Sequence, residues 1–258
     1  MTLERRLLYR SAFWEIARPR HPLTAGHILI RLSDPSTEFG LASASDWLFC
    51  HNLARAALRD VLGATRHAVM FAHRWHPLGS AIGEPVAESS TPTFHLFGRW
   101  DGESTTPGAQ LSLPAHHRRG EPDHRLEAID AAVREALRLN RPTSMVSSGH
   151  DVSHGVEPSA ESGSLVRTVQ AGTHHTVIEP TRAVTAIREI RASELLAIAA
   201  SLAELPLTGG LSGFSCLALE PKTADAPIRV HALGRSAAET TNPLEDLLRS
   251  PEVSLALL

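Results

Sequence analysis

One short stretch occurs twice in the chain and constrains its fold more than any other feature. Residues 91–100 read TPTFHLFGRW and residues 228–235 read IRVHALGR, so both contain an apolar residue, His, any residue, an apolar residue, Gly and Arg. The histidines His95 and His231 are 136 positions apart (231 − 95), and so are the arginines (235 − 99). A constant offset between similar stretches is typical of an internal repeat. We therefore predict two similar halves, with the functional site where the two histidine strands meet.

The composition narrows the class of protein. At 258 residues the chain can bury a core without disulfides, and its net charge of −3 gives no general attraction to nucleic acid or anionic membranes. Cys50 and Cys216 lie in apolar segments and lack metal or redox spacing, so we expect buried thiols in a reducing compartment. There is no secretory leader pattern and no run of about 18 apolar residues. We expect a cytoplasmic monomer or homodimer with no nucleic-acid or membrane partner, no metal and no cofactor.

Hydrophobic periodicity predicts the same order of elements in both halves: a strand, a helix, a strand and a histidine strand. In the first half these are a strand from His27, a helix beginning at Ser45 and Asp46, a strand over 67–74 and the His95 strand. In the second half they are strands over 166–169 and 174–180, a helix capped by Ser193, a strand over 213–219 and the His231 strand. The predicted units are an N-terminal half over 1–104, a linker with one helix over 105–163, and a C-terminal half over 164–258.

The linker contains a stretch of uncertain role, residues 144–163, which is rich in Ser, Gly and His and is predicted to form turns. His150 and His154 are four residues apart, a spacing that places two metal ligands on one helical face. Gly149 and Gly155 oppose a helix there, and no further ligand has a metal-finger spacing. The sequence therefore predicts no metal site.

Several fragments of the chain resemble the histidine-triad (HIT) superfamily. Residues 22–30 (PLTAGHILI) are similar to an early motif of that family, and 94–99 (FHLFGR) and 175–182 (HTVIEPTR) to later ones. The duplicated layout is similar to the galactose-1-phosphate uridylyltransferase and dinucleoside-polyphosphate phosphorylase branch. The resemblance implies an α+β fold of two tandem HIT-like halves, which form an intramolecular pseudo-dimer with a shared antiparallel sheet.

The family's chemistry depends on alternating histidines, which share one face of a strand because side chains alternate with a period of two. Aligned on the Gly-Arg pair, His95 takes the third histidine position, and Thr91 and Thr93 take the first and second. In the second half Pro227 and Arg229 precede His231 in the same way. A register shift by two residues would instead make His95 the nucleophile, and the sequence leaves both alignments open.

The candidate site follows from these motifs. His95 and His231 are the predicted catalytic residues. His73 and His76 flank Arg74, a combination that can hold a phosphate. The Gly-rich loop after them can offer backbone amides to the same phosphate, or it can be a solvated loop. His27 can contact the ligand or have a structural role. The predicted nucleotide- or phosphate-binding residues are His27, His73, Arg74, His76, Gly79, Ser80, Gly83, Thr91, Thr93 and Arg99.

Three functions remain open from the sequence. The resemblance implies an enzyme that performs nucleotidyl transfer or phosphoanhydride cleavage, as a transferase, phosphorylase or hydrolase, on a nucleotide or sugar-nucleotide through an active-strand His. The second is a catalytically degenerate nucleotide-binding or scaffold protein, because the alternating histidines are missing. The third is a HIT scaffold repurposed for another reaction in a specialised biosynthetic pathway, using Thr91, Thr93 and Glu84 or Glu88.

Overall fold

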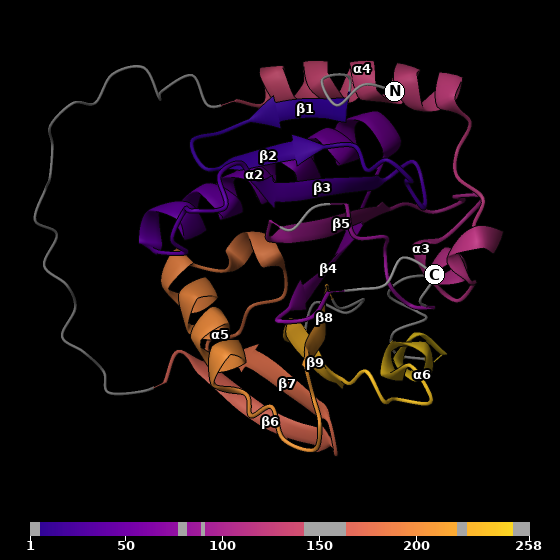
Figure 1. Cartoon of the computed structure of the whole chain (residues 1–258). Coiled ribbons are helices and arrows are strands. Elements are labelled where there is room, and N and C mark those ends of the chain that lie inside the picture. The colour runs from indigo at the N-terminus through magenta and orange to yellow at the C-terminus, as the bar shows by residue number, and fades with distance from the viewer. Residues whose placement is uncertain (1–5, 77–81, 89–90, 142–163, 221–225, 250–258) are drawn as a thin grey trace, which may run out of the picture.

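The computed structural model describes residues 6–76, 82–88, 91–141, 164–220 and 226–249, and its centre is a single antiparallel sheet (Figure 1). The sheet has nine strands in the order β1-β2-β3-β5-β4-β8-β9-β7-β6. The strands are β1 (Leu7–Arg10), β2 (Trp14–Ala17), β3 (His27–Leu32), β4 (Arg66–His73), β5 (Thr93–Arg99), β6 (Val166–Gly172), β7 (His175–Pro180), β8 (Gly213–Leu219) and β9 (Arg229–Arg235). The predicted α+β class and the presence of a large antiparallel sheet are confirmed.

Five α-helices are described: α2 (Leu41–Leu62), α3 (Pro107–Leu111), α4 (Asp123–Leu139), α5 (Ala192–Glu204) and α6 (Pro243–Arg249). Helices α2 and α5 cover one face of the sheet, where most of the buried apolar side chains form one large core. The opposite face carries a smaller core that includes Leu111 of α3 and Leu244 of α6. Among the helices described, none combines the length and apolarity needed to cross a bilayer.

The middle of the sheet is the pairing of β4 with β8, which joins the first and second halves of the sequence. Met70 of β4 is opposite His95 of β5 on one side and Leu217 of β8 on the other, and Leu217 is opposite His231 of β9. Cross-strand partners point to the same face of a sheet. His95 and His231 therefore lie in one row on the face opposite α2 and α5, separated by two strands.

The two halves share a set of local contacts around the repeated motif. The Gly98 amide donates to the Gly26 carbonyl over 2.9 Å, and the Gly234 amide donates to the His174 carbonyl over 2.7 Å. A Cβ at position 26 would collide with the Gly98 carbonyl oxygen, so this close approach requires glycine. The Gly-Arg pair thus holds the histidine strand against its neighbour.

Helix α2 begins earlier than its sequence predicts. We expected Ser45 and Asp46 at its N-terminus, but it begins at Leu41 after Gly40. The Ser45 hydroxyl donates back to the Leu41 carbonyl over 2.7 Å, and Asp46 accepts hydrogen bonds from the turn between β1 and β2. Asp46 therefore makes tertiary hydrogen bonds and does not cap the helix. The predicted end of the helix at Gly63 is confirmed, and Gly63 has a left-handed φ of 71°. Helix α5 likewise begins at Ala192, one residue before the predicted Ser193 cap.

The segment predicted as a linker with one helix contains more structure than expected. Besides α4 it forms α3 and a 3₁₀ turn over Ala115–His117, and Leu111 is fully buried. Helix α4 packs on α2 and covers the sheet edge at β1. Residues 142–163, which include the Ser/Gly/His stretch, lie outside the described residues.

Candidate ligand-binding site

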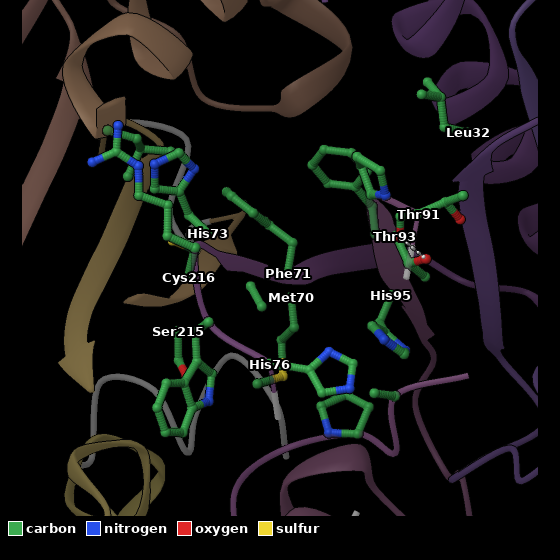
Figure 2. Close-up of a pocket in the computed structure, with 18 of the residues that line it drawn as sticks. Leu32, Met70, Phe71, His73, His76, Thr91, Thr93, His95, Ser215 and Cys216 are labelled. Carbon is green, nitrogen blue, oxygen red and sulfur yellow. Dashed lines mark hydrogen bonds between the residues drawn. The ribbon is translucent and has the colours of Figure 1, made fainter. Parts of the chain in front are cut away.

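The candidate site is a cavity of about 630 Å³ at the place where β4 ends and β5 begins (Figure 2). Its lining includes six of the sequence-predicted site residues: His73, Arg74, His76, Thr91, Thr93 and His95. The rest of the lining is mostly apolar, and it comes from both halves of the chain. A volume of this size is in the range that accommodates a small-molecule ligand.

His95 borders the cavity with an imidazole whose orientation is fixed from behind. It is 9% exposed, and its Nδ1 lies 3.0 Å from Nε2 of the fully buried His27. On the other side of His27, Nδ1 accepts the backbone N–H of Leu23 over 3.1 Å. His27 is therefore the link between a backbone amide and the cavity-facing histidine.

This chain of contacts determines which nitrogen carries each proton. Burial, followed by the nearby His95, holds the pKa of His27 well below its usual value, and burial lowers the pKa of His95 to about 4. Both rings are neutral at pH 7. Because the amide of Leu23 can only donate, His27 has its proton on Nε2 and donates it to Nδ1 of His95. The proton of His95 is then on Nε2, and among the described residues this N–H has no partner within the protein.

The second half contains the same imidazole pair in a different setting. Nε2 of His175 lies 3.0 Å from Nδ1 of His231, and burial lowers the pKa of His231 to about 4. No described amide donates to the other nitrogen of His175, and His231 is not part of the cavity wall. The two histidine pairs are thus matched in their ring-to-ring distance, and of their members only His95 lines this cavity.

The mouth of the cavity carries the predicted phosphate-binding side chains. Met70 and His95 are cross-strand partners and point to the same face of the sheet. His73 is three residues beyond Met70, so its side chain points to the opposite face, which α5 covers. The cavity is lined by residues of both faces and extends around the strand ends between them. Burial lowers the pKa of His73, whose Nε2 is buried without a hydrogen-bond partner. Arg74 has a left-handed φ of 54° and is exposed. Thr93 uses its hydroxyl to donate to the Thr91 carbonyl over 2.9 Å.

Other predicted site residues lie elsewhere. Arg99 is 1% exposed, forms an ion pair with Glu103 and is not part of the cavity wall. Gly83 has a left-handed φ of 79° and donates its amide to the Leu111 carbonyl over 2.6 Å, so this amide is engaged within the chain instead of open to a ligand. Gly79 and Ser80 lie outside the described residues.

The cavity wall also carries a buried polar cluster around Glu84, which was not among the predicted catalytic or phosphate-binding residues. Glu84 accepts hydrogen bonds from the Ser215 hydroxyl and from Nε1 of Trp75, the latter over 3.1 Å, and forms an ion pair with Arg235. Burial raises the pKa of Glu84, and the Arg235 guanidinium lies 5.0 Å from the centre of the Trp75 ring. Ser215 and Arg235 reach Glu84 because β8 pairs with β4. The cluster therefore joins the two halves beside the cavity.

The charges around the cavity nearly cancel. Glu84 is paired with Arg235, and Glu88 forms an ion pair with Arg6 over 2.8 Å. Arg74 is the one cation among the described lining residues that has no ion pair. No group of three or more His, Cys, Asp or Glu side chains suited to a metal ion occurs in the described part of the chain.

Comparisons with known proteins give distant structural matches. No family profile and no curated protein sequence matches the chain. Among solved structures, a hypothetical histidine triad nucleotide-binding protein from Sulfolobus tokodaii strain 7 matches with 14% identity and a TM-score of 0.37, covering 56% of this chain and 91% of its own. A Hit-like protein involved in cell-cycle regulation from Bartonella henselae matches with 18% identity and a TM-score of 0.32, covering 51% and 85%. These two structural neighbours are histidine-triad proteins by description, each similar to about half of this chain.

Proposed function

We propose that the chain binds the phosphoryl group of a small ligand in this cavity, with His95 as a hydrogen-bond donor and not as a nucleophile. The observation that carries the proposal is the relay from the Leu23 amide through His27 to His95, which places an N–H at the cavity wall. A phosphoryl oxygen is a strong acceptor for such a donor. Arg74 borders the same cavity and supplies positive charge. A nucleotide is the ligand class that the sequence resemblance implies.

The relay opposes the nucleophilic role. For Nε2 of His95 to attack phosphorus it must carry a lone pair, so the proton must be on Nδ1 and must point at His27. His27 would then carry its own proton on Nδ1, facing the Leu23 amide, and a buried donor would lose its acceptor. Such a loss costs about 1–3 kcal/mol. The geometry therefore favours the binding protein over the transferase.

Nucleotidyl transfer or phosphoanhydride cleavage through His95 is the second candidate function. Its support is that His95 is uncharged at neutral pH, as an attacking imidazole must be, and that it borders the cavity. Among the described residues, His95 lines this cavity and His231 does not, so in either function we assign the working site to the first half.

We also propose that residues 1–104 and 164–258 are tandem HIT-like halves, joined by 105–163 and arranged as a pseudo-dimer about the β4–β8 pairing. Three matched features support this relation: the histidine pairs His27/His95 and His175/His231, the glycine contacts of Gly98 and Gly234, and the buried arginines that each pair with a Glu four residues later.

Calorimetric titration with adenosine 5′-monophosphate and with inorganic phosphate tests the function. The proteins compared are the natural chain and His95→Ala, and His231→Ala is the matched control. A hydrogen bond to a charged group contributes about 1.5–3 kcal/mol, so His95→Ala should weaken binding by roughly 10- to 150-fold, and His231→Ala should leave it unchanged. A parallel incubation with α-phosphate-labelled ATP, quenched in acid and in base, looks for a nucleotidyl-histidine adduct, which forms when the imidazole attacks the α-phosphorus and pyrophosphate leaves.

The two candidate functions give different results. Binding that depends on His95 without a labelled adduct supports the binding protein. An acid-labile adduct that is absent from His95→Ala would establish the transfer and overturn the binding role. Equal affinities in the natural chain and His95→Ala, with no labelled adduct in either, would overturn both.

A further inference from the structure

We propose that the body of the ligand attached to this phosphoryl group is a hydrocarbon, an alkyl chain or an unsubstituted ring, and not a nucleobase. This inference rests on the proposed phosphoryl site at His95 and names the class of molecule that fills the remainder of the cavity. It follows from the chemistry of the cavity wall on the α5 side of the sheet.

The cavity continues from the His95 side around the strand ends to an apolar chamber. The chamber is defined by the aromatic side chains Trp14, Phe39, Phe71 and Phe94 and by the aliphatic side chains Leu195, Ile198, Ala199 and Leu202 of α5. Its aromatic wall is continuous: the ring centroids of Phe71 and Phe94 are 5.0 Å apart, and those of Trp14 and Phe94 are 5.7 Å apart. Phe71 and His95 extend in different directions from adjacent strands in Figure 2, which agrees with their opposite faces.

The chamber has too few polar side chains for a nucleobase. Nε1 of Trp14 is already used in a 2.8 Å hydrogen bond to the Ser43 carbonyl. Of the other described side chains on this side of the cavity, Thr37 and His73 can form ordinary hydrogen bonds with a ligand, and Cys216 is a fully buried thiol. A purine base carries more donors and acceptors than these two can satisfy, and each one left unpaired costs about 1–3 kcal/mol. A hydrocarbon body has no such cost.

The charge of the wall matches a single anionic group. The carboxylates of Glu84 and Glu88 border the cavity and are each paired with an arginine, and Arg74 is the one cation of the described lining without an ion pair. A triphosphate carries several negative charges, which one exposed guanidinium does not balance. A phosphate monoester with an apolar body matches both the charge and the wall.

Titration of the full chain with a matched ligand series tests the inference. The probes are inorganic phosphate, adenosine 5′-monophosphate, and butyl, hexyl and octyl phosphate, all kept below their micelle-forming concentrations. Burial of one CH₂ contributes roughly 0.8 kcal/mol, so each added CH₂ should raise the affinity about three- to fourfold until the chamber is filled. Hexyl phosphate should bind more tightly than adenosine 5′-monophosphate.

Two neighbouring leucines of α5 provide a matched pair of variants. Leu195 and Leu196 are both half-buried, but Leu195 borders the cavity and Leu196 does not. Leu195→Gln should remove most of the chain-length gain and leave binding of inorganic phosphate unchanged, whereas Leu196→Gln should preserve both. If Leu195→Gln fails to fold, Ala199→Leu replaces it. The larger side chain fills part of the chamber and should reduce the alkyl chain length at which affinity stops rising.

The outcomes separate this inference from the function beneath it. Tighter binding of adenosine 5′-monophosphate than of hexyl phosphate would overturn the hydrocarbon body and retain the phosphoryl site. The same chain-length gain in Leu195→Gln and Leu196→Gln would also overturn it, because the chain would then lie outside the chamber. If none of the phosphate esters binds to the folded protein, the proposed function itself fails.

Discussion

A buried histidine outside the cavity gives a quantitative prediction about acid stability. His51 of α2 is fully buried, its ring is stacked on Trp47 with a centroid separation of 5.3 Å, and neither ring nitrogen has a hydrogen-bond partner among the described residues. Burial, followed by the neighbouring His67, lowers the pKa of His51 to about 3. The native state therefore keeps this ring neutral at pH values where an unfolded chain would protonate it.

The pKa of His51 sets the sign and size of the effect. An unfolded histidine has a pKa of about 6.5, so between that value and about 3 the unfolded state binds one more proton than the native state. The free energy of unfolding then decreases as the pH falls, by up to about 1.4 kcal/mol per pH unit for this one group. From about pH 6.5 to about pH 4.5 the integrated loss is roughly 2.3 kcal/mol, a large share of the 5–15 kcal/mol typical of a protein.

The variant His51→Leu removes the titrating group and two buried polar atoms, so it should be at least as stable as the natural chain at neutral pH and should lose less stability in acid. Urea unfolding followed by circular dichroism, in steps from about pH 7.5 to about pH 4.5, measures both slopes. His124→Leu is the control, because His124 is exposed at the start of α4. Parallel pH profiles for the natural chain and His51→Leu would refute the reasoning.

Three further predictions concern the relay and the repeated motif. Long-range ¹H–¹⁵N spectra should show the proton of His95 on Nε2; a proton on Nδ1 would remove the basis of the binding role. Arg99→Gln leaves the buried Glu103 without its partner and should lower the urea-unfolding free energy by about 3–5 kcal/mol, whereas a loss below about 1 kcal/mol would mean that the pair is effectively solvated. Gly26→Ala should cost about 1–3 kcal/mol in the same assay because its Cβ meets the Gly98 carbonyl, while Gly120→Ala, which has ordinary contacts, should change stability by about 0.5 kcal/mol or less.

The sequence predicted the strands well because their signals are local. His95 and His231 lie among apolar residues with Gly-Arg after them, and this pattern placed both strands to within a few residues of their observed bounds. The same-face position of the two histidines was not predicted from the pattern, because it depends on the register of β4 against β8. Strand partners are chosen by tertiary packing, and a single sequence does not contain that choice.

The same limit explains the missed parts of the candidate site. Ser215 and Leu195 border the cavity although they are at least one hundred residues from His95 in the sequence, and no local sequence pattern connects them to it. For Arg99, by contrast, a usable signal was present. An acid follows four residues after the arginine in both copies of the motif, as Glu103 and Glu239, and this repeated spacing indicates an ion pair within the protein.

The β4–β8 junction makes each half of the chain dependent on the other. Each of these strands has a neighbour from its own half on one edge and a neighbour from the other half on the opposite edge. Either half expressed alone would present an open strand edge with unpaired backbone groups, and such edges recruit other strands. Fragments expressed together should reassociate by complementation, while a solitary fragment should self-associate or precipitate.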